Sequence, residues 1–463
     1  MTAPLLVFSR RSKWLAVFSF VALCAVIVFA ADEKVRYLSL AQAQETLQMF
    51  ADSGIAGSSI SEPGAWDRWI REQDAEVRGR IAGGVEDSIS NFVLYGTSYT
   101  ELPRLENPES ALAPDGTVSA AARARISALD AALGSANANE RIRFIRDYLT
   151  RKGITRAATK GFLNENLRRF TQEQHEYQKK LMAAQNSGDV NQMLLTRGTL
   201  YENRGLSADT SLMTNYALED TLRALLARGD LSEGKIRRIA VIGPGLDFTN
   251  KHNGYDFYPL QTIQPFAVME MALRLQLAKP DDLEVVTLDL NPAVNEHIAK
   301  LARDARAGRA YTVQLPRDTN GDWPAGAVAY WQHFGEIIGR QAKPLPVPQA
   351  AGAVTLRAVT IAPRFAARVT PLDVNIVAQE MSLEPGRGFD LVIATNILVY
   401  YDLFQQALAM ANIAHMMNPG ALFLSNDTLS AHHVAALVFL YRRSVSFSTS
   451  GPYGDNVLTY GRR

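Results

Sequence analysis

Residues 240–248 read AVIGPGLDF, a short apolar strand that runs directly into a turn containing Gly243, Pro244 and Gly245. In a sheet of parallel strands, ligands bind outside the carboxyl ends of the strands, at turns of this kind. Glycines let the backbone approach a ligand closely, so Gly243 and Gly245 are predicted to contact one. Two residues after Gly245, where a third glycine is expected, this sequence has Asp247 instead.

On both sides of this turn, short apolar strands alternate with helices. Strands are predicted at 236–242, 284–290, 372–378, 389–395 and 421–426, and helices at 259–278, 292–306 and 403–417. This alternation is typical of a parallel sheet covered by helices on both faces. The chain then ends in a predicted helix at 429–442 and two strands, 445–449 and 456–460. We therefore expect an α/β fold with a doubly wound, mostly parallel seven-stranded sheet and a C-terminal antiparallel hairpin.

The predicted sheet occupies residues 205–463, and residues 32–204 are predicted to form a helical N-terminal domain. Within that domain, helical periodicity covers 120–133, 140–151 and 161–184. Asp87 is predicted to cap a short helix that ends at Gly96, and Ser98 then lies in a packed turn rather than acting as a nucleophile. Residues 311–371 interrupt the sheet domain with an irregular insertion, and such long loops are commonly lids. The insertion is therefore predicted to cover the cleft.

The N-terminus reads as an export signal or a membrane anchor, residues 1–31. Basic residues Arg10, Arg11 and Lys13 precede an almost uninterrupted apolar run from 14 to 31. The expected location is therefore at the membrane or outside the cytosol, with a cytoplasmic location as the alternative. The single cysteine, Cys24, lies in this run, so disulfides and thiolate metal sites are excluded from the rest of the chain.

Charge and histidine spacing indicate neither a nucleic-acid partner nor a metal site. The chain has 48 Lys and Arg against 47 Asp and Glu, so no basic excess points to nucleic acid. The 7 histidines, including the adjacent His432 and His433, lack the spacing of metal ligands.

Asp289 stands at the end of the strand that follows the glycine turn. An acid there accepts hydrogen bonds from the two hydroxyls of a ribose, and Leu290 beside it is also predicted to contact the cofactor. The segment between Gly245 and the next helix is too long for a pyrophosphate-binding turn, and Asp247 would repel a diphosphate. A nicotinamide cofactor is thus disfavoured, whereas the cationic sulfonium of S-adenosylmethionine suits an acidic turn.

With these features, residues 205–463 resemble class I S-adenosylmethionine-dependent methyltransferases. The resemblance rests on the glycine turn, Asp289, the stretch FDLVIATNILVYYD (389–402) and the terminal hairpin, in that order. Residues 389–426 are also similar to chemotaxis-receptor methyltransferases. The resemblance implies that S-adenosylmethionine is the cofactor, that Asn396 helps to bind it, and that the helix at 210–229 packs over its edge.

The methyl acceptor, a small molecule or a protein, is not identified by the sequence. Tyr400 and Tyr258 are the candidate catalytic residues, and position alone suggests that an acceptor pocket is lined by Tyr255, Asp256, Tyr258, Gln261 and Gln264. One departure matters: family members usually carry an acid where this chain has Val241. The alternative function is therefore a binding or structural protein on a degenerate methyltransferase fold, in which Asp247 would be the remaining acid at the turn.

Overall fold

The computed structural model describes residues 34–51, 60–136, 138–186, 205–206, 211–248, 254–427, 434–451 and 453–463. The predicted signal or anchor at 1–31 and the histidine pair at 432–433 lie outside these ranges. In the parts of the chain that are described, no helix is both long and apolar enough to cross a membrane.

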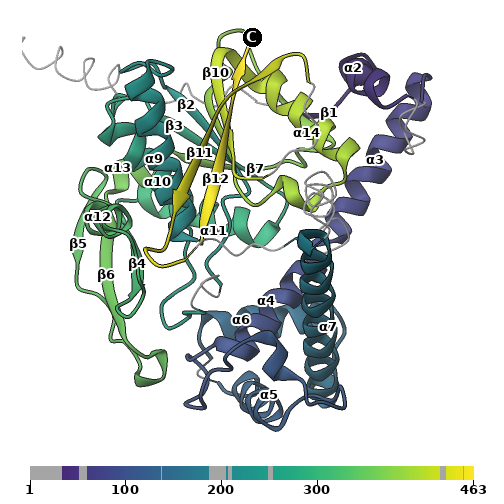
Figure 1. The fold of residues 1–463 in the computed structure, drawn as a ribbon, viewed down its shortest axis with the longest axis vertical. Helices are drawn as coiled ribbons and strands as arrows, with labels where there is room; N and C mark the ends of the chain where they lie inside the picture. The colour runs from purple at the N-terminus through teal and green to yellow at the C-terminus, as the bar shows by residue number, and fades with distance from the viewer. Residues whose placement is uncertain are drawn as a thin grey trace, which may run out of the picture.

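A seven-stranded sheet forms the centre of the C-terminal half (Figure 1), in the order β11-β12-β10-β9-β2-β3-β7. The strands are β2 (Arg238–Ile242), β3 (Glu284–Asp289), β7 (Val369–Asp373), β9 (Phe389–Ala394), β10 (Met417–Ser425), β11 (Leu437–Ser446) and β12 (Gly454–Arg462). The four pairs from β10 to β7 are parallel, and β12 runs antiparallel to both of its neighbours. A mostly parallel seven-stranded sheet is therefore confirmed.

Strand β2 lies at the point where the strand order reverses. It pairs with β3 on one side and with β9 on the other, so the connections that leave these strands diverge at its carboxyl end. Ligands bind at such a switch point in open α/β sheets. The glycine turn follows β2 directly and lies there.

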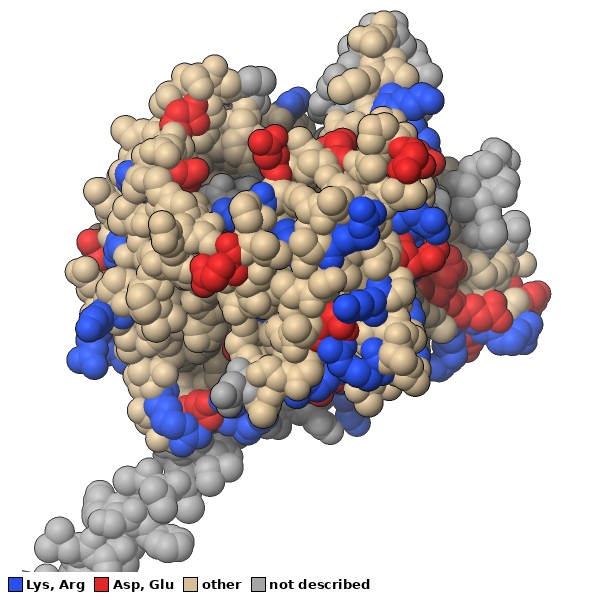
Figure 2. Space-filling model, turned by 90° about the horizontal axis from the view of Figure 1, so that it is seen from below, with Lys and Arg blue, Asp and Glu red and all other residues tan. Residues whose placement is uncertain are grey.

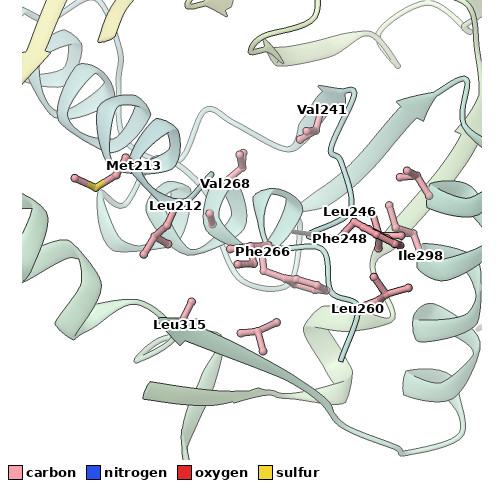
Figure 3. Packing of buried hydrophobic residues seen from close by; sticks show 14 of the residues in the cluster. Leu212, Met213, Val241, Leu246, Phe248, Leu260, Phe266, Val268, Ile298 and Leu315 are labelled. Atoms are coloured by element: carbon pink, nitrogen blue, oxygen red, sulfur yellow. The ribbon is translucent and has the colours of Figure 1, made fainter. Parts of the chain in front are cut away.

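Alternating residues of β2 belong to two different apolar cores, one on each face of the sheet. Val241 packs in the core that contains α9 (Leu212–Arg228), α10 (Gln264–Arg274) and α11 (Pro292–Arg306), part of which is drawn in Figure 3. Ile242 packs in the core that contains α14 (Leu403–Met416). Burial on both faces is why β2 reads as a continuous apolar run.

The chain before the sheet is mostly helical, and its later helices lie together at one end of the molecule, in the lower part of Figure 1. Its elements are β1 (Lys34–Tyr37), α2 (Leu40–Phe50), α3 (Pro63–Gly79), α4 (Ile81–Tyr95), η1 (Pro108–Ala111), α5 (Ala120–Leu133), α6 (Glu140–Arg151), η2 (Arg156–Ala158) and α7 (Thr159–Asn186). The bounds of α5 and α6 are those predicted. Strand β1 pairs with β8 (Gln379–Ser382), so the first described residues join the C-terminal half.

Helix α4 corrects the role predicted for Asp87. The helix starts at Ile81, so Asp87 lies within it and its carboxylate accepts a hydrogen bond from Arg169 Nη2 at 2.7 Å instead of capping the helix. The helix does end at Gly96, as predicted.

The insertion at 311–371 is ordered rather than irregular. It forms an antiparallel sheet of β4 (Tyr311–Asp318), β6 (Val354–Ile361) and β5 (Gly339–Ala342), with η3 (Gln349–Ala351), and carries α12 (Ala325–His333) and α13 (Pro363–Ala366). Proline- and glycine-rich connections conceal these strands in the sequence.

Three element boundaries also differ from prediction. Helix α10 begins at Gln264 rather than 259, since Pro265 suits the first turn of a helix. Strand β7 lies at Val369–Asp373 rather than 372–378. The predicted helix at 429–442 is wrong from Leu437 onward, because its apolar residues pair with β12 as a strand.

Acidic and basic side chains are interspersed on the face shown in Figure 2. Among the described residues of that face, no extended region carries a single sign of charge.

Candidate functional site

A pocket opens at the carboxyl ends of β2, β3, β7 and β9. Residues that end or follow these strands form most of its wall: Ile242, Gly243, Gly245, Leu288, Asp289, Leu290, Asn291, Val374, Ile376, Thr395, Asn396 and Ile397. The remaining wall comes from other elements: Ile81, Leu206, Ser211, Thr214, Gln264, Tyr400 and Tyr401. Among these lining residues, Asp289 is the one with a charged side chain.

The glycine turn adopts a backbone conformation that requires glycine. Gly243 and Gly245 have φ angles of 63° and 72°, in the left-handed region that other residues avoid. The Gly243 N–H donates to the Leu288 carbonyl at 2.8 Å, which ties the turn to β3. A Cβ atom on Gly243 would lie 2.1 Å from Ile397 Cδ1, so the turn also packs tightly against the loop after β9.

Asp289 places its carboxyl group in the pocket and is held there by the backbone. Its Oδ1 accepts the Asn291 N–H at 2.8 Å. Burial raises the pKa of this carboxyl to about 7; the nearby Asp373 also raises it, while the backbone N–H groups of Asn291, Gly245 and Leu290 lower it. The group therefore changes charge near neutral pH.

The loop after β9 is fixed by residues at the end of β10. Asn396 has a φ of 57°, and its N–H donates to Asn426 Oδ1 at 2.7 Å. Asp427 Oδ2 accepts the N–H groups of Ile397 at 3.1 Å and Leu398 at 2.8 Å. Burial raises the Asp427 pKa to about 6. Asp427 was not among the predicted site residues, although its place just after a predicted strand was a usable signal.

Tyr400 and Tyr401 both line the pocket beside this loop. Tyr400 ends the short helix η4 (Leu398–Tyr400), and its carbonyl accepts a hydrogen bond from Arg80 Nη2 at 2.7 Å. Burial raises the pKa of the Tyr401 hydroxyl, so it stays protonated at neutral pH.

The structure places Asp247 outside the pocket, which corrects its predicted role at the turn. Its Oδ2 accepts hydrogen bonds from the Tyr258 hydroxyl at 2.9 Å and from Gln261 Nε2 at 3.0 Å, and the side chain is buried. Its position supports neither a contact with the cofactor nor repulsion of a diphosphate in the pocket. Tyr258, whose hydroxyl donates to Asp247, likewise does not line the pocket.

The predicted acceptor pocket is not assembled as one surface. Of its five residues only Gln264 lines the pocket, and its Nε2 donates to Thr395 Oγ1 at 2.8 Å. Asp256 binds the segment that contains Thr97 and Ser98, which confirms that Ser98 lies in a packed turn.

The pocket is not covered by the insertion at 311–371, which was predicted to be its lid. None of the described residues from 311 to 371 lines it, so the insertion is not its lid. Instead, Ile81 and Leu206 from the chain before the sheet and Ser211 and Thr214 near the start of α9 complete the wall. The predicted helix at 210–229 thus does reach the pocket, whereas nothing local in the sequence marks Ile81 or Leu206.

No protein-family model matches the chain, and neither does any curated protein sequence. Among solved structures, the N-methyltransferase NodS from Bradyrhizobium japonicum WM9, in complex with S-adenosyl-L-homocysteine, is 12% identical and matches over 52% of this chain and 86% of its own, with a TM-score of 0.25. Magnesium protoporphyrin IX methyltransferase (ChlM) from Synechocystis PCC 6803 with bound SAM is 11% identical over 61% of this chain and 97% of its own, with a TM-score of 0.24. The glycopeptide N-methyltransferase MtfA is 8% identical over 53% of this chain and 90% of its own, with a TM-score of 0.25.

Proposed function

We propose that this protein is a methyltransferase that uses S-adenosylmethionine. The observation that carries the proposal is the convergence of Gly243, Gly245 and Asp289 on one pocket at the switch point of the sheet. Glycines there admit the cofactor to the backbone, and the carboxylate of Asp289 accepts hydrogen bonds from the ribose hydroxyls. The resemblance of residues 205–463 to class I methyltransferases supports the same conclusion.

The charge of the pocket favours S-adenosylmethionine over a dinucleotide. Among the described lining residues there is no Lys or Arg to balance a diphosphate, and the charged side chain is the acid Asp289. A carboxylate attracts a cationic ligand, and the attraction is stronger in a partly buried site than in water. Asp247 makes no contribution to this charge, because its side chain lies outside the pocket.

When bound, the cofactor supplies an electrophilic methyl group, and the protein has to provide alignment and exclude water. The apolar side chains of Ile242, Leu288 and Val374 line the pocket and limit the entry of water. Asn396 and Tyr400 stand at the β9 end of the pocket, and we propose that they face the acceptor. Tyr400 remains the catalytic candidate, whereas Tyr258 binds Asp247 away from the pocket.

The alternative is a protein that binds an adenosyl ligand without turning it over. It is motivated by Val241, which is buried in the sheet where the related enzymes usually carry an acid, and by the position of Asp247. The similarity of residues 389–426 to chemotaxis-receptor methyltransferases stays a prediction.

Calorimetric titration of the purified protein with S-adenosylmethionine, S-adenosylhomocysteine and NAD tests the proposal. We expect both adenosyl ligands to bind and NAD to bind far more weakly. Failure of both adenosyl ligands to bind would refute the proposed function. If both ligands bind, transfer of the methyl group from S-adenosylmethionine to water or to added acceptors is then measured. Transfer that depends on the protein indicates an enzyme, and its absence indicates a binding protein.

The pKa of Asp289 predicts how binding depends on pH. If the ribose hydroxyls require the carboxylate, a pKa of about 7 means that affinity falls as pH is lowered. The dissociation constant of S-adenosylhomocysteine is then expected to be about tenfold larger at pH 6 than at pH 8. In Asp289→Asn, which cannot ionise, this dependence should disappear, so the same slope in the variant would contradict the assignment.

A further inference from the structure

Arg141 is a buried arginine of helix α6 that contacts the segment after the glycine turn. That segment, here called the turn segment, comprises the described residues 246–248 and 254–263. Arg141 is only 3% exposed, and its guanidinium donates to three carbonyl groups of the segment: Asp247 at 2.9 Å, Phe248 and Tyr258. One side chain thus joins both described parts of the segment.

The charge of Arg141 also acts on a carboxyl group of the turn segment. The guanidinium lies near the buried carboxyl group of Asp247, whose pKa burial raises and the Arg141 charge lowers. The Asp247 N–H in turn donates to the Gln261 carbonyl at 2.7 Å, which closes the segment on itself. A guanidinium presents several donors in a rigid planar fork, so lysine is not an equivalent replacement here.

Two further contacts bind the turn segment to the N-terminal helices. Glu140, next to Arg141, accepts the Leu260 N–H at 2.9 Å. Asp256 accepts two hydrogen bonds from Thr97, both at 2.8 Å, and two from Ser98, at 3.0 Å from its N–H and 2.6 Å from its hydroxyl. The segment is therefore held by α6 and by the turn after α4, both of which lie before the sheet in the sequence.

The turn segment joins the two parts of the chain that form one wall of the pocket. Gly245 lies immediately before it and Gln264 immediately after it, and both line the pocket. A change in the path of the segment can therefore displace the glycine turn or the start of α10. The sheet holds both ends as well, because the Gly243 N–H donates to the Leu288 carbonyl and Gln264 Nε2 donates to Thr395 Oγ1.

We infer that Arg141 is a positioning residue for the cofactor pocket, through which the N-terminal helices hold the glycine turn in its binding conformation. The inference rests on the proposed function for the identity of the ligand. Apparent affinity falls in proportion to the fraction of molecules in the binding-competent conformation. Loss of the Arg141 contacts should therefore weaken binding even though Arg141 does not touch the ligand.

The test compares the full chain with Arg141→Lys, using S-adenosylhomocysteine as the calorimetric probe. If the variant holds the turn correctly in about one molecule in ten, the dissociation constant rises about tenfold. Hydrogen exchange without ligand should accelerate about tenfold or more at the amides of Asp247 and Leu260, because exchange follows the fraction of open molecules, while α14 exchanges as before. Arg143→Lys is the matched control, since Arg143 lies on the same helix and its bond to the Ala138 carbonyl is exposed.

Equal affinity in the variant and the parent would overturn the inference, and so would exchange that accelerates throughout the protein, because that indicates a global loss of stability. If Arg141→Lys does not fold, Glu140→Ala removes one weaker contact on the same segment and should shift affinity in the same direction by a smaller factor. If the parent binds no adenosyl ligand, the proposed function fails. The local exchange measurement still decides whether Arg141 positions the turn.

Discussion

Replacement of Gly243 by alanine is expected to lower the free energy of unfolding by about 2–5 kcal/mol. Two costs combine: about 1–2 kcal/mol for a left-handed backbone in a residue with a Cβ, and about 1–3 kcal/mol for overpacking. Overpacking is severe here because the new methyl group would lie 2.1 Å from Ile397 Cδ1. Urea denaturation measures the change, and calorimetry should find ligand binding greatly weakened because Ile397 also lines the pocket.

Gly116→Ala is the control that separates these two costs. Gly116 has a φ of 78°, similar to that of Gly243, but nothing lies within 4 Å of the position of its Cβ. It should therefore cost only about 1–2 kcal/mol.

The double variant Gly243→Ala/Ile397→Ala tests the clash itself. Removal of the Ile397 side chain makes room for the new methyl group, so the double variant should be destabilised by less than the sum of the single variants, with a coupling of about 0.5–3 kcal/mol. Strictly additive costs would show that contact with Ile397 does not decide the effect.

Asp289→Ala is expected to weaken the binding of S-adenosylhomocysteine about a hundredfold at pH 8. At that pH most of the carboxyl is ionised, since its pKa is about 7. Each hydrogen bond to a charged group is worth about 1.5–3 kcal/mol, and the loss of about 2.8 kcal/mol corresponds to a hundredfold. Calorimetric titration of the variant and the parent measures this difference directly.

The stability of Asp289→Ala provides a second readout. Loss of the carboxyl is expected to weaken ligand binding at pH 8 but to lessen the fall in stability as pH rises. The pKa of Asp289 is raised above 3.8 on folding, so its contribution to stability is greatest below the pKa of the unfolded chain and is lost as pH rises towards 7. Replacement of the carboxyl should therefore flatten the fall in stability between pH 4 and pH 8. The buried Asp289 carboxyl thus makes the free protein less stable as pH rises.

Asp373→Asn is the matched control for Asp289. Asp373 pairs with Asp289 in the register of β7 against β3, but it does not line the pocket and its side chain is 54% exposed. Binding at pH 8 should be the same as in the parent. An equal loss of affinity in both variants would contradict the assignment of this loss to hydrogen bonds of the Asp289 carboxyl.

The parts of the site that the sequence predicted are those that follow strands. Gly243, Gly245, Asp289, Leu290 and Asn396 all line the pocket. Parallel strands bring their carboxyl ends to one edge of the sheet, so a residue's place in the strand pattern is enough to bring it to the site. Helices α5 and α6 were predictable for a similar reason, because helical periodicity is written in neighbouring residues.

Contacts that join distant parts of the chain could not be predicted from the sequence. Asp247 is adjacent to the turn, yet Arg141, 106 residues earlier, binds its carbonyl, and Tyr258 and Gln261 bind its carboxylate away from the pocket. The part of β11 at 437–442 was predicted as a helix because its apolar residues do not reveal their pairing with β12.

Local patterns alone thus specified an α/β sheet with a glycine turn and an acid at its edge, since strand periodicity and glycine conformation depend on adjacent residues. Only the folded chain decided which way Asp247 faces, that Ile81 and Leu206 cover the pocket, and that the insertion does not. The physical reason is that these outcomes depend on packing and hydrogen bonds between segments far apart in the sequence. No pattern within one segment records its partner in another.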